Sequence, residues 1–511
     1  AEDGSLVGYE VVSQGRIPID GESFLMEGRI PVRLSELHLS VPSGSMHWFS
    51  NHPDRMQVVE QSEHSATIRV TGRPGIPDEP DAPPTSSLAL QIVVNYDPQG
   101  PSAINSWDEA GRIYHPMAET AEKSDANISA EVETLVAGKT DALPKMDALY
   151  NYVSREIRYV AIEIGVGGYQ PHPAPEVLMN KYGDCKNKAT LLMAMLDHIG
   201  LRGYPALVGT RDDVEADPKV PTLATFDHFI VALPVPASLR PAVEHFPAYD
   251  AQTQILWIDP TSEYDPLGQV PDMDQGVFAL ISYPDHGELQ RIPVPPPSEN
   301  RIRYDVHVHL QPDGSGIADV QAQFWGAMNA SRHAYYRGRS QEEIRHGFEN
   351  RVARYANQAT FRQASIAGIE DSRQQITERF SFSGDFSTAS SGDSWFFQPL
   401  FLSGIGVPES GPRPRELPLD IGMPSEVQVN YVFDLPPGMR IDRVPENKQA
   451  TSEFGAFQVE YSESGNTLQV TRTTTYSVSR IPPENYPAFR DFVTGNLRLE
   501  RQLLRMVKIA P

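Results

Sequence analysis

The sequence predicts an α+β protein in which one unit of mixed helices and strands lies between two mostly β, sandwich-like regions. A chain of 511 residues is long enough for about three domains, at roughly 100–200 residues each. Short runs of alternating apolar and polar residues occupy the first and last parts of the chain, and helical spacing of apolar residues appears between them. We therefore expect domains at residues 1–128, 129–290 and 291–511.

The first region is predicted to be β-rich. Ala66, Ile68 and Val70 alternate with polar residues, which is typical of a strand with one buried face. Residues 72–87 are polar and rich in proline, so we expect a loop there, and the apolar run 88–96 predicts the next strand.

The middle region begins with helices. Apolar residues share one face of a predicted helix at Met146, Leu149, Val153 and Ile157. Pro144 suits the first turn of this helix. A second helix is predicted to begin near Cys185 and to end at Gly200. A short strand is expected to begin at residue 158 and to lead into a Gly- and Pro-rich loop. Further strands are expected at 204–210, 227–235 and 255–260.

The last region follows a Pro-rich linker at 292–298. Strict alternation over 301–310, a Pro-Asp-Gly turn and the run 316–325 predict a β-hairpin. Ser340 and Glu343 form a capping box for a helix at about 341–357. Further strands are predicted at 427–435, 457–462 and 468–478, followed by a helix from Asn485 onward.

Composition excludes several classes of protein. With 43 Lys plus Arg against 67 Asp plus Glu, the net charge is −24, which opposes binding to nucleic acid or to an anionic membrane. The longest apolar runs, such as 88–94, are far shorter than the roughly 20 residues of a membrane span. A single cysteine excludes an intrachain disulfide and a Cys-based zinc cluster.

That cysteine has the placement of a nucleophile. Cys185 opens the second predicted helix, after Gly183 and Asp184. A helix N-terminus and a neighbouring imidazolium both stabilise a thiolate. We expect Gly183 to supply an unusual backbone angle and Asp184 to cap the helix.

A base and an orienting carboxylate follow in the same unit. His228 lies on the predicted strand 227–235, and Asp259 ends the apolar strand 255–260. A nucleophilic cysteine needs a base, and the base needs a carboxylate to orient it. Taken singly, each has a structural explanation: a buried small cysteine, a core histidine and an Asp-Pro turn. Their joint occurrence favours a catalytic triad.

The motif KYGDCKNKATLLMAML, with FDHFIVAL and WIDPTSEYDPLGQVP, resembles the transglutaminase-like superfamily. The resemblance is closest to bacterial members with a DUF3857 β-domain ahead of the core and a further β-domain behind it. It implies a papain-like core in which Cys185 is the nucleophile, His228 the general base and Asp259 its orienting partner. Asn187 stands where close relatives often have Asp. The resemblance also implies a periplasmic or cell-envelope location and a longer first β-domain, so we expect that a segment ahead of Ala1 is missing.

Other candidate residues have weaker patterns. The backbone N–H of Cys185, the Gln170 side chain and Tyr169 are candidate oxyanion donors, although Tyr169 could simply pack and Gln170 could lie on a surface loop. His307 and His309 share a strand face and could bind a metal, but the sequence offers only these two ligands, so a solvated face is favoured. We predict no metal, no calcium dependence and no cofactor.

The predicted function is therefore a cysteine enzyme that acts on amide or peptide bonds through an acyl-thioester on Cys185. Hydrolysis, as in a protease or amidase, is favoured over transfer to an amine, as in a transglutaminase. The expected partner is a protein or peptide substrate. The alternative is a catalytically silent cell-envelope scaffold with a vestigial core. The sequence leaves the oligomeric state open.

Overall fold

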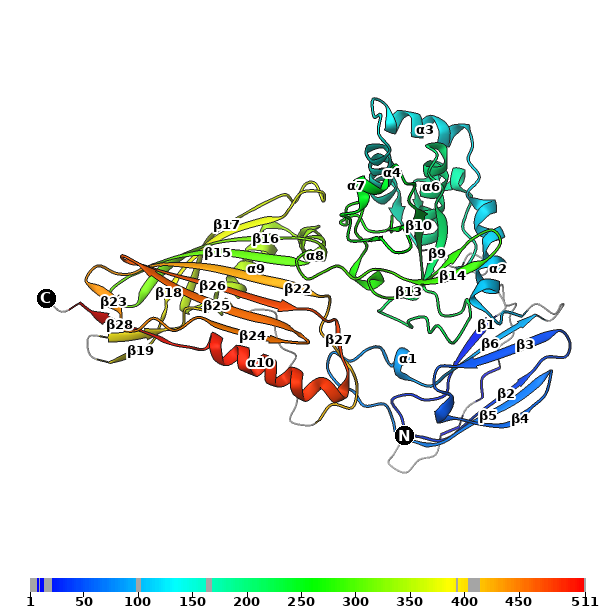
Figure 1. Ribbon diagram of the computed structural model, residues 1–511, viewed down its shortest axis with the longest axis horizontal. Coiled ribbons are helices and arrows are strands. Elements are labelled where there is room, and N and C mark those ends of the chain that lie inside the picture. Colours follow the sequence, from blue (N-terminus) through cyan, green and yellow to red (C-terminus); the bar gives the residue numbers. More distant parts are fainter. Residues whose placement is uncertain are drawn as a thin grey trace.

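The computed structural model describes residues 7–8, 10–12, 21–97, 103–161, 168–391, 394–402 and 414–509. The described elements form three parts that follow one another along the chain (Figure 1). The N-terminal strands and the mixed middle part lie side by side, and the β-rich C-terminal part extends away from them as an elongated body. None of the helices in the described part of the chain has the length and apolar content of a membrane span.

The N-terminal part contains two three-stranded antiparallel sheets, with strand orders β1-β6-β3 and β2-β5-β4. Their bounds are β1 Gly21–Leu25, β2 Val32–Ser40, β3 Ser45–Ser50, β4 Gln57–Gln61, β5 Ser65–Arg73 and β6 Gln91–Asp97, with the short helices η1 Pro53–Arg55 and α1 Thr85–Leu88. Ile68 and Val70 of β5 share a small core with Ile92 and Val94 of β6. The predicted alternation on β5 is confirmed, and the predicted loop 72–87 differs at both ends, where β5 continues to Arg73 and α1 begins at Thr85.

The middle part is built on a six-stranded antiparallel sheet of order β11-β12-β10-β9-β13-β14. Its strands are β9 Tyr204–Val208, β10 His228–Pro234, β11 Tyr249–Asp250, β12 Ile255–Ile258, β13 Phe278–Ser282 and β14 Gly287–Arg291. Its helices are α2 Trp107–Ala121, α3 Ala126–Val136, α4 Ala142–Glu156, α5 Ala174–Asn180, α6 Cys185–His198, α7 Arg240–Val243 and η3 Asp272–Asp274.

Helix α6 is the central element of this part. It packs against β9 and β10 and against α3, α4 and α5, and residues 185–196 are all buried. Within the described residues, the predicted strand from residue 158 forms β7 (Arg158–Tyr159), which pairs in parallel with β8 (Tyr182–Gly183). Residues 160–161 lie outside a strand, 168–173 contain no strand, as expected for a loop, and the part of the prediction on 162–167 lies outside the described residues.

Helix α2 was not predicted from the sequence. It contains Pro116, and Gly111 packs so closely on Gly287 of β14 that a Cβ on Gly111 would lie 2.3 Å from the Gly287 Cα. Ser282 of β13 also donates to the Gly111 carbonyl at 2.7 Å. Thus α2 packs on the six-stranded sheet of the middle part, whereas the predicted domain boundary after residue 128 assigns α2 to the first domain and this sheet to the second. The domain boundaries stay predictions.

The C-terminal part is dominated by an eight-stranded sheet of order β17-β18-β16-β15-β22-β26-β25-β24. Its strands are β15 Arg301–Leu310, β16 Ser315–Phe324, β17 Asn357–Ala367, β18 Thr377–Asp385, β22 Ser425–Asp434, β24 Lys448–Ser452, β25 Gly455–Ser464 and β26 Thr467–Tyr476. Only β15 and β22 pair in parallel among these described strands. The predicted hairpin, formed by β15 and β16, is confirmed.

Smaller elements complete this part. A four-stranded sheet has the order β19-β20-β28-β23, and β21 pairs with β27. The bounds are β19 Ser387–Ser391, β20 Ser394–Phe397, β21 Leu419–Asp420, β23 Met439–Ile441, β27 Arg480–Ile481, β28 Leu504–Lys508, α8 Ala327–Tyr336, α9 Gln341–Val352, η4 Pro483–Asn485 and α10 Tyr486–Glu500. The predicted capping box of Ser340 and Glu343 is confirmed at the start of α9.

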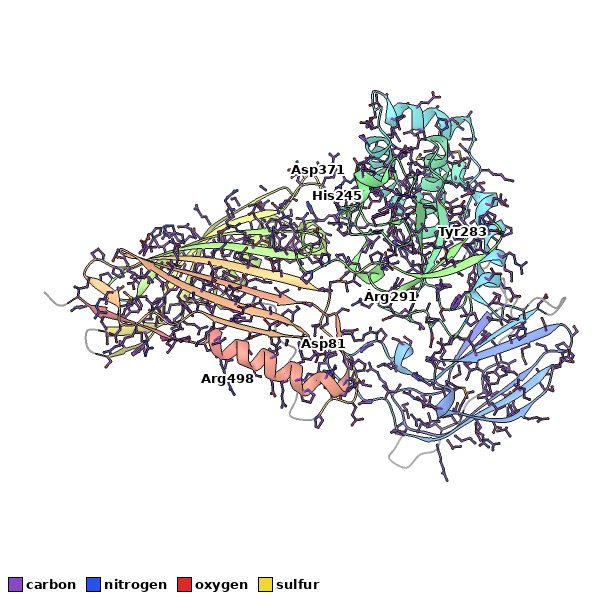
Figure 2. The ribbon with its side chains drawn as sticks, in the orientation of Figure 1. Asp81, His245, Tyr283, Arg291, Asp371 and Arg498 are labelled. Carbon is purple, nitrogen blue, oxygen red and sulfur yellow. The ribbon has the colours of Figure 1, made fainter. Side chains whose placement is uncertain are left out.

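The C-terminal part contacts the loop that follows β12. The Arg337 guanidinium pairs with Glu263 and donates to the Tyr264 hydroxyl at 2.9 Å. Asp371, in the connection between β17 and β18, pairs with Arg155 of α4 at 3.4 Å. Figure 2 shows Asp371 at the upper junction between the C-terminal and middle parts.

The N-terminal part is also joined to both neighbours. The Asp81 carbonyl accepts the Asp420 N–H at 2.8 Å, at the lower junction in Figure 2. Asn95 of β6 is fully buried and donates to the Pro221 carbonyl at 2.7 Å, while its Oδ1 accepts the Thr222 hydroxyl at 2.9 Å. The loop between β9 and β10 is therefore anchored on the N-terminal sheet.

Candidate active site

Cys185 is the first residue of helix α6, and its side chain is buried. Asp184 is the N-cap: its Oδ1 accepts the Asn187 N–H at 3.1 Å, as predicted. The other oxygen, Oδ2, pairs with the buried Lys186 Nζ at 2.5 Å. A capped and tightly packed first turn holds the thiol at the positive end of the helix dipole.

Gly183 is required for a different reason from the one expected. It is extended in β8 and is not among the positive-φ glycines of the described chain. Instead, a Cβ at Gly183 would lie 2.6 Å from the Asn187 Cβ. The glycine lets the strand before Cys185 pass closely over the first turn of α6.

His228 and Asp259 lie next to each other. Strands β10 and β12 are antiparallel neighbours with Val231 opposite Ile258, so the first residue of β10 comes close to the residue after β12. His228 Nε2 is 3.2 Å from Asp259 Oδ2. The N–H and hydroxyl of Thr261 donate to the two Asp259 oxygens at 2.8 and 2.9 Å.

The electrostatics favour a charged imidazole. Burial alone would lower the pKa of His228, but the charges of Asp259 and Asp274 and hydrogen bonds to Asp259 and Cys185 raise this pKa well above its usual value. Burial raises the pKa of Asp259, but the His228 charge and the hydrogen bonds from His228 and Thr261 together lower it below its usual value. At neutral pH the pair is therefore an imidazolium and a carboxylate, with the Cys185 sulfur beside it.

A second carboxyl group completes this cluster. Asp274, the last residue of η3, is fully buried and its Oδ2 lies 3.9 Å from His228 Nε2. Burial and the neighbouring Asp259 raise the pKa of Asp274 well above its usual value, despite the opposing effect of His228. Asp274 therefore keeps its proton to a higher pH than an ordinary aspartate does. The sequence analysis missed it because a carboxylate in a polar loop gives no sign of burial.

Two further buried ionisable groups lie nearby. Burial raises the pKa of Asp265 to about 6, and the Ser262 hydroxyl donates to its Oδ2 at 2.6 Å. Burial lowers the pKa of Lys188 to about 8, with Asp259 opposing the shift, and its Nζ donates to the Ser154 carbonyl at 3.0 Å. Clustered shifts of this kind are typical of active sites.

The predicted oxyanion donors are not joined to this cluster by side-chain hydrogen bonds among the described residues. Gln170 is exposed, and the Tyr169 carbonyl accepts the Tyr114 hydroxyl at 2.8 Å. Burial raises the pKa of Tyr114 well above its usual value, and the nearby Cys185 adds to the shift. Tyr114 of α2 therefore places the 168–173 loop beside Cys185, a role that only the packing of α2 reveals.

Within the described residues, two groups of side chains have the composition of a metal site. His228, Asp259 and Asp274 offer ligand atoms within 4.8 Å of one another, and so do His307, His309 and Asp434. In the first group the charged His228 ring satisfies Asp259 without a metal. The second group lies on the C-terminal sheet, far along the chain from Cys185.

Comparison with known families identifies the middle part. Residues 130–204 match the family model described as the transglutaminase-like superfamily. The chain contains a transglutaminase-like domain. The match includes Cys185 and the whole of α6 and ends before His228 and Asp259. Residues 393–502 match DUF3858, a domain of unknown function with a solved structure. The family found is thus DUF3858, whereas the DUF3857-like character of residues 1–128 stays a prediction.

Solved structures give a similar fold over nearly the whole chain. A protein of Parabacteroides distasonis, called a "putative protease", has a TM-score of 0.58 and 13% identity, covering 96% of this chain and 76% of that one. This likeness places the transglutaminase-like domain within a three-part fold that has been seen before.

Two weaker structural matches cover 47% of this chain. A "putative cysteine protease" of Cytophaga hutchinsonii has a TM-score of 0.21, 9% identity and 74% of its own chain covered. The periplasmic domain of TgpA from Pseudomonas aeruginosa has a TM-score of 0.19, 13% identity and 73% of its chain covered. No curated protein matches the sequence significantly.

Proposed function

We propose that the protein is a cysteine enzyme that cleaves amide or peptide bonds in a protein or peptide substrate. The Cys185 sulfur attacks the carbonyl carbon, the C–N bond breaks, and His228 gives its proton to the leaving amine. Water then attacks the thioester while His228 accepts one of its protons, and the C–S bond breaks. This releases the carboxylic acid and restores the Cys185 thiolate beside the imidazolium. Asp259 keeps the imidazole oriented and stabilises its charge.

The observation that supports this proposal most is the buried His228–Asp259 pair, whose imidazole interacts with the only cysteine of the chain. Burying charged groups is costly unless they have a function or good partners. A silent scaffold has no physical need for an imidazolium, two carboxyl groups and a thiol in one buried cluster. The scaffold alternative is therefore less favoured.

The proposal favours hydrolysis over amine transfer. Both reactions share the acyl-thioester, and they differ in whether water or an amine resolves it. A peptide substrate incubated with a labelled primary amine distinguishes them, because transfer gives a labelled amide and hydrolysis a free acid. Cys185→Ala should remove both products.

The first test is the pH dependence of Cys185 alkylation by iodoacetamide. We expect His228→Ala to slow alkylation at pH 7 by at least about tenfold, because the imidazolium no longer stabilises the thiolate. His198→Ala is a matched control, since His198 is exposed at the far end of the same helix. Equal rates in the native protein and His228→Ala would contradict the proposed triad.

We also propose a periplasmic or cell-envelope location, which rests on the family resemblance. Expression of the complete gene product followed by fractionation of periplasm, membrane and cytosol tests it. Recovery in the cytosol would contradict this part of the proposal and leave the chemistry unaffected.

A further inference from the structure

The exposed face of the C-terminal sheet brings together two histidines and an aspartate. His307 and His309 are two residues apart on β15 and therefore point to the same side. In the parallel pairing of β15 with β22, His309 lies opposite Asp434, the last residue of β22. Asp434 Oδ2 is 2.9 Å from His307 Nε2 and 2.7 Å from His309 Nδ1.

We propose that His307, His309 and Asp434 bind one divalent transition-metal ion, with Zn²⁺ the best match. Two imidazole nitrogens and a carboxylate oxygen form a donor set that zinc uses in proteins, with a remaining position open to water or a ligand. The three ligand atoms already lie within 4.8 Å of one another. The sequence analysis saw only two ligands because Asp434 is brought to them by strand pairing.

The arrangement is unusual for a simple surface ion pair. Two imidazole rings, with centroids 4.3 Å apart, converge on one carboxylate oxygen. A metal ion uses both rings in their neutral form together with the carboxylate.

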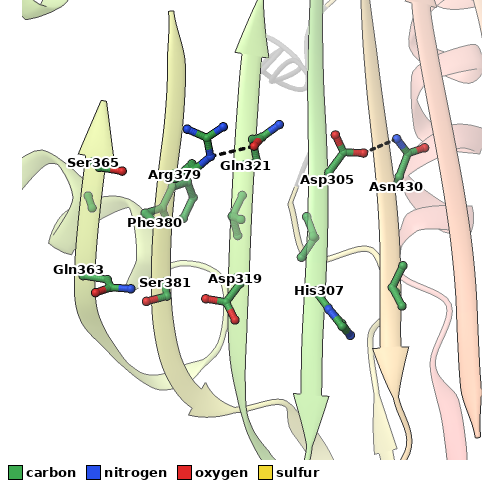
Figure 3. Close-up of a pocket in the computed structure, with 14 residues that line it drawn as sticks. Asp305, His307, Asp319, Gln321, Gln363, Ser365, Arg379, Phe380, Ser381 and Asn430 are labelled. Carbon is green, nitrogen blue, oxygen red and sulfur yellow. Dashed lines mark hydrogen bonds between the residues drawn. The ribbon is translucent and has the colours of Figure 1, made fainter. Parts of the chain in front are cut away.

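The surroundings suit a cation. His307 lines an open cavity of about 550 Å³ together with Asp305, Asp319 and Arg379. Arg379 donates to Gln321 at 2.9 Å, and Figure 3 shows the His307 side chain reaching from β15 toward the neighbouring strand that carries Asn430. The guanidinium of Arg303 is already paired with Asp305 at 3.0 Å. The side chains of His307 and His309 are each 46% exposed, so an ion can reach them from solvent.

The site also lies on a seam of the domain. The β15–β22 pair joins the strands of residues 301–385 to those of residues 425–476, and it is the one parallel pair of this sheet within the described residues. Parallel pairing is slightly less stable per residue than antiparallel pairing. A metal held by both strands would link the two halves and raise the melting temperature by mass action.

Cobalt(II) titration of the full chain, made without a polyhistidine tag and treated with a chelator, tests the proposal. We expect one Co²⁺ per chain, displaced by Zn²⁺, with visible d–d absorption and no thiolate-to-cobalt band, because Cys185 is the only cysteine. His309→Ala and Asp434→Ala should each weaken binding at least about 100-fold. His346→Ala, which removes an exposed histidine paired with Glu342 and Glu349, should leave it unchanged.

Three outcomes would overturn the proposal: no saturable binding, binding that survives both His309→Ala and Asp434→Ala, or binding that shows a thiolate band or is lost in Cys185→Ala. The last would place the ion in the candidate active site. Each variant is first melted without metal to confirm that it folds. Zn²⁺ should then raise the melting temperature of the native chain and of Cys185→Ala, but not that of the two ligand variants.

Discussion

At the scale of single residues, burial determines the chemistry of the candidate active site. Burial opposes the charge on His228, but the neighbouring carboxylates and hydrogen bonds raise the pKa of the imidazole. The two carboxyl groups beside it shift in opposite directions: the pKa of Asp259 is lowered, and burial raises the pKa of Asp274 despite the nearby imidazole. Asp259 is therefore the more readily ionised partner of His228.

This difference predicts unequal effects of two similar substitutions. Asp259→Asn removes a negative charge, so His228 should lose its proton more easily and alkylation of Cys185 at pH 7 should fall about tenfold. Asp274→Asn should have a smaller effect, less than about threefold, because the raised pKa of Asp274 makes it carry less negative charge than Asp259. Iodoacetamide kinetics on both variants provide the measurement. An equal loss in both would mean that Asp274 is ionised.

Asp265 predicts a pH dependence of stability. Its pKa in the folded protein is about 6, above the ordinary 3.8, so the folded state binds the proton more tightly than the unfolded state. The resulting stabilisation is complete below about pH 4 and is lost as the pH rises through about 6. We expect the native chain to lose roughly 2–4 kcal/mol over this range relative to Asp265→Asn, measured by urea denaturation at pH 4 and pH 8. Parallel pH profiles would contradict the assignment.

At the scale of elements, helix α6 and its approach from β8 position Cys185, the proposed nucleophile. Asp184 caps the helix, Lys186 neutralises the cap, and Asn187 accepts the His172 N–H at 2.7 Å. Asn187 thus links the first turn of α6 to the 168–173 loop.

The close approach at Gly183 predicts a cost for any side chain there. Gly183→Ala would place a methyl group 2.6 Å from the Asn187 Cβ, so we expect the free energy of unfolding to fall by about 1–3 kcal/mol. Gly495→Ala is the matched control, because Gly495 lies in α10 with open space around it and should gain up to about 1 kcal/mol. Urea denaturation measures both, and a neutral Gly183→Ala would show that Asn187 moves freely.

At the scale of the whole molecule, both flanking parts hold loops of the transglutaminase-like domain. The C-terminal part contacts Glu263 and Tyr264, a few residues after Asp259, through Arg337. The N-terminal part holds the loop before His228 through Asn95. The loops around the His228–Asp259 pair are therefore positioned by neighbours outside the central sheet.

Asn95 provides a test of this coupling. Asn95→Ala would leave the buried Pro221 and Ile104 carbonyls and the Thr222 hydroxyl without their partner, at a cost of about 1–3 kcal/mol or more. We expect a lower melting temperature and a first unfolding step that includes the N-terminal sheet. Calorimetry measures both. Asn127→Ala, at an exposed position of α3, should change stability by less than about 0.5 kcal/mol. A single unchanged transition in Asn95→Ala would contradict the coupling.

The sequence by itself determined several of the helices and strands and the positions of the candidate catalytic side chains on them. Alternation over 301–310 and the periodicity around Met146 depend on local geometry, so β15 and α4 could be predicted. The placement of Cys185 at a helix start and of His228 on a strand followed from the same patterns. Helix α2 was missed because Gly111 and Pro116 weaken its local signal and packing on β14 compensates.

Only the tertiary structure decided which charges are buried and which distant residues meet. Asp274, Asp265 and Lys188 look like solvated groups in the sequence, because burial depends on what packs over a residue and not on its neighbours in the chain. Asp434 joins His307 and His309 through strand register across more than 100 residues of chain, which no local pattern encodes. Protonation states and ligand sets follow from these long-range contacts.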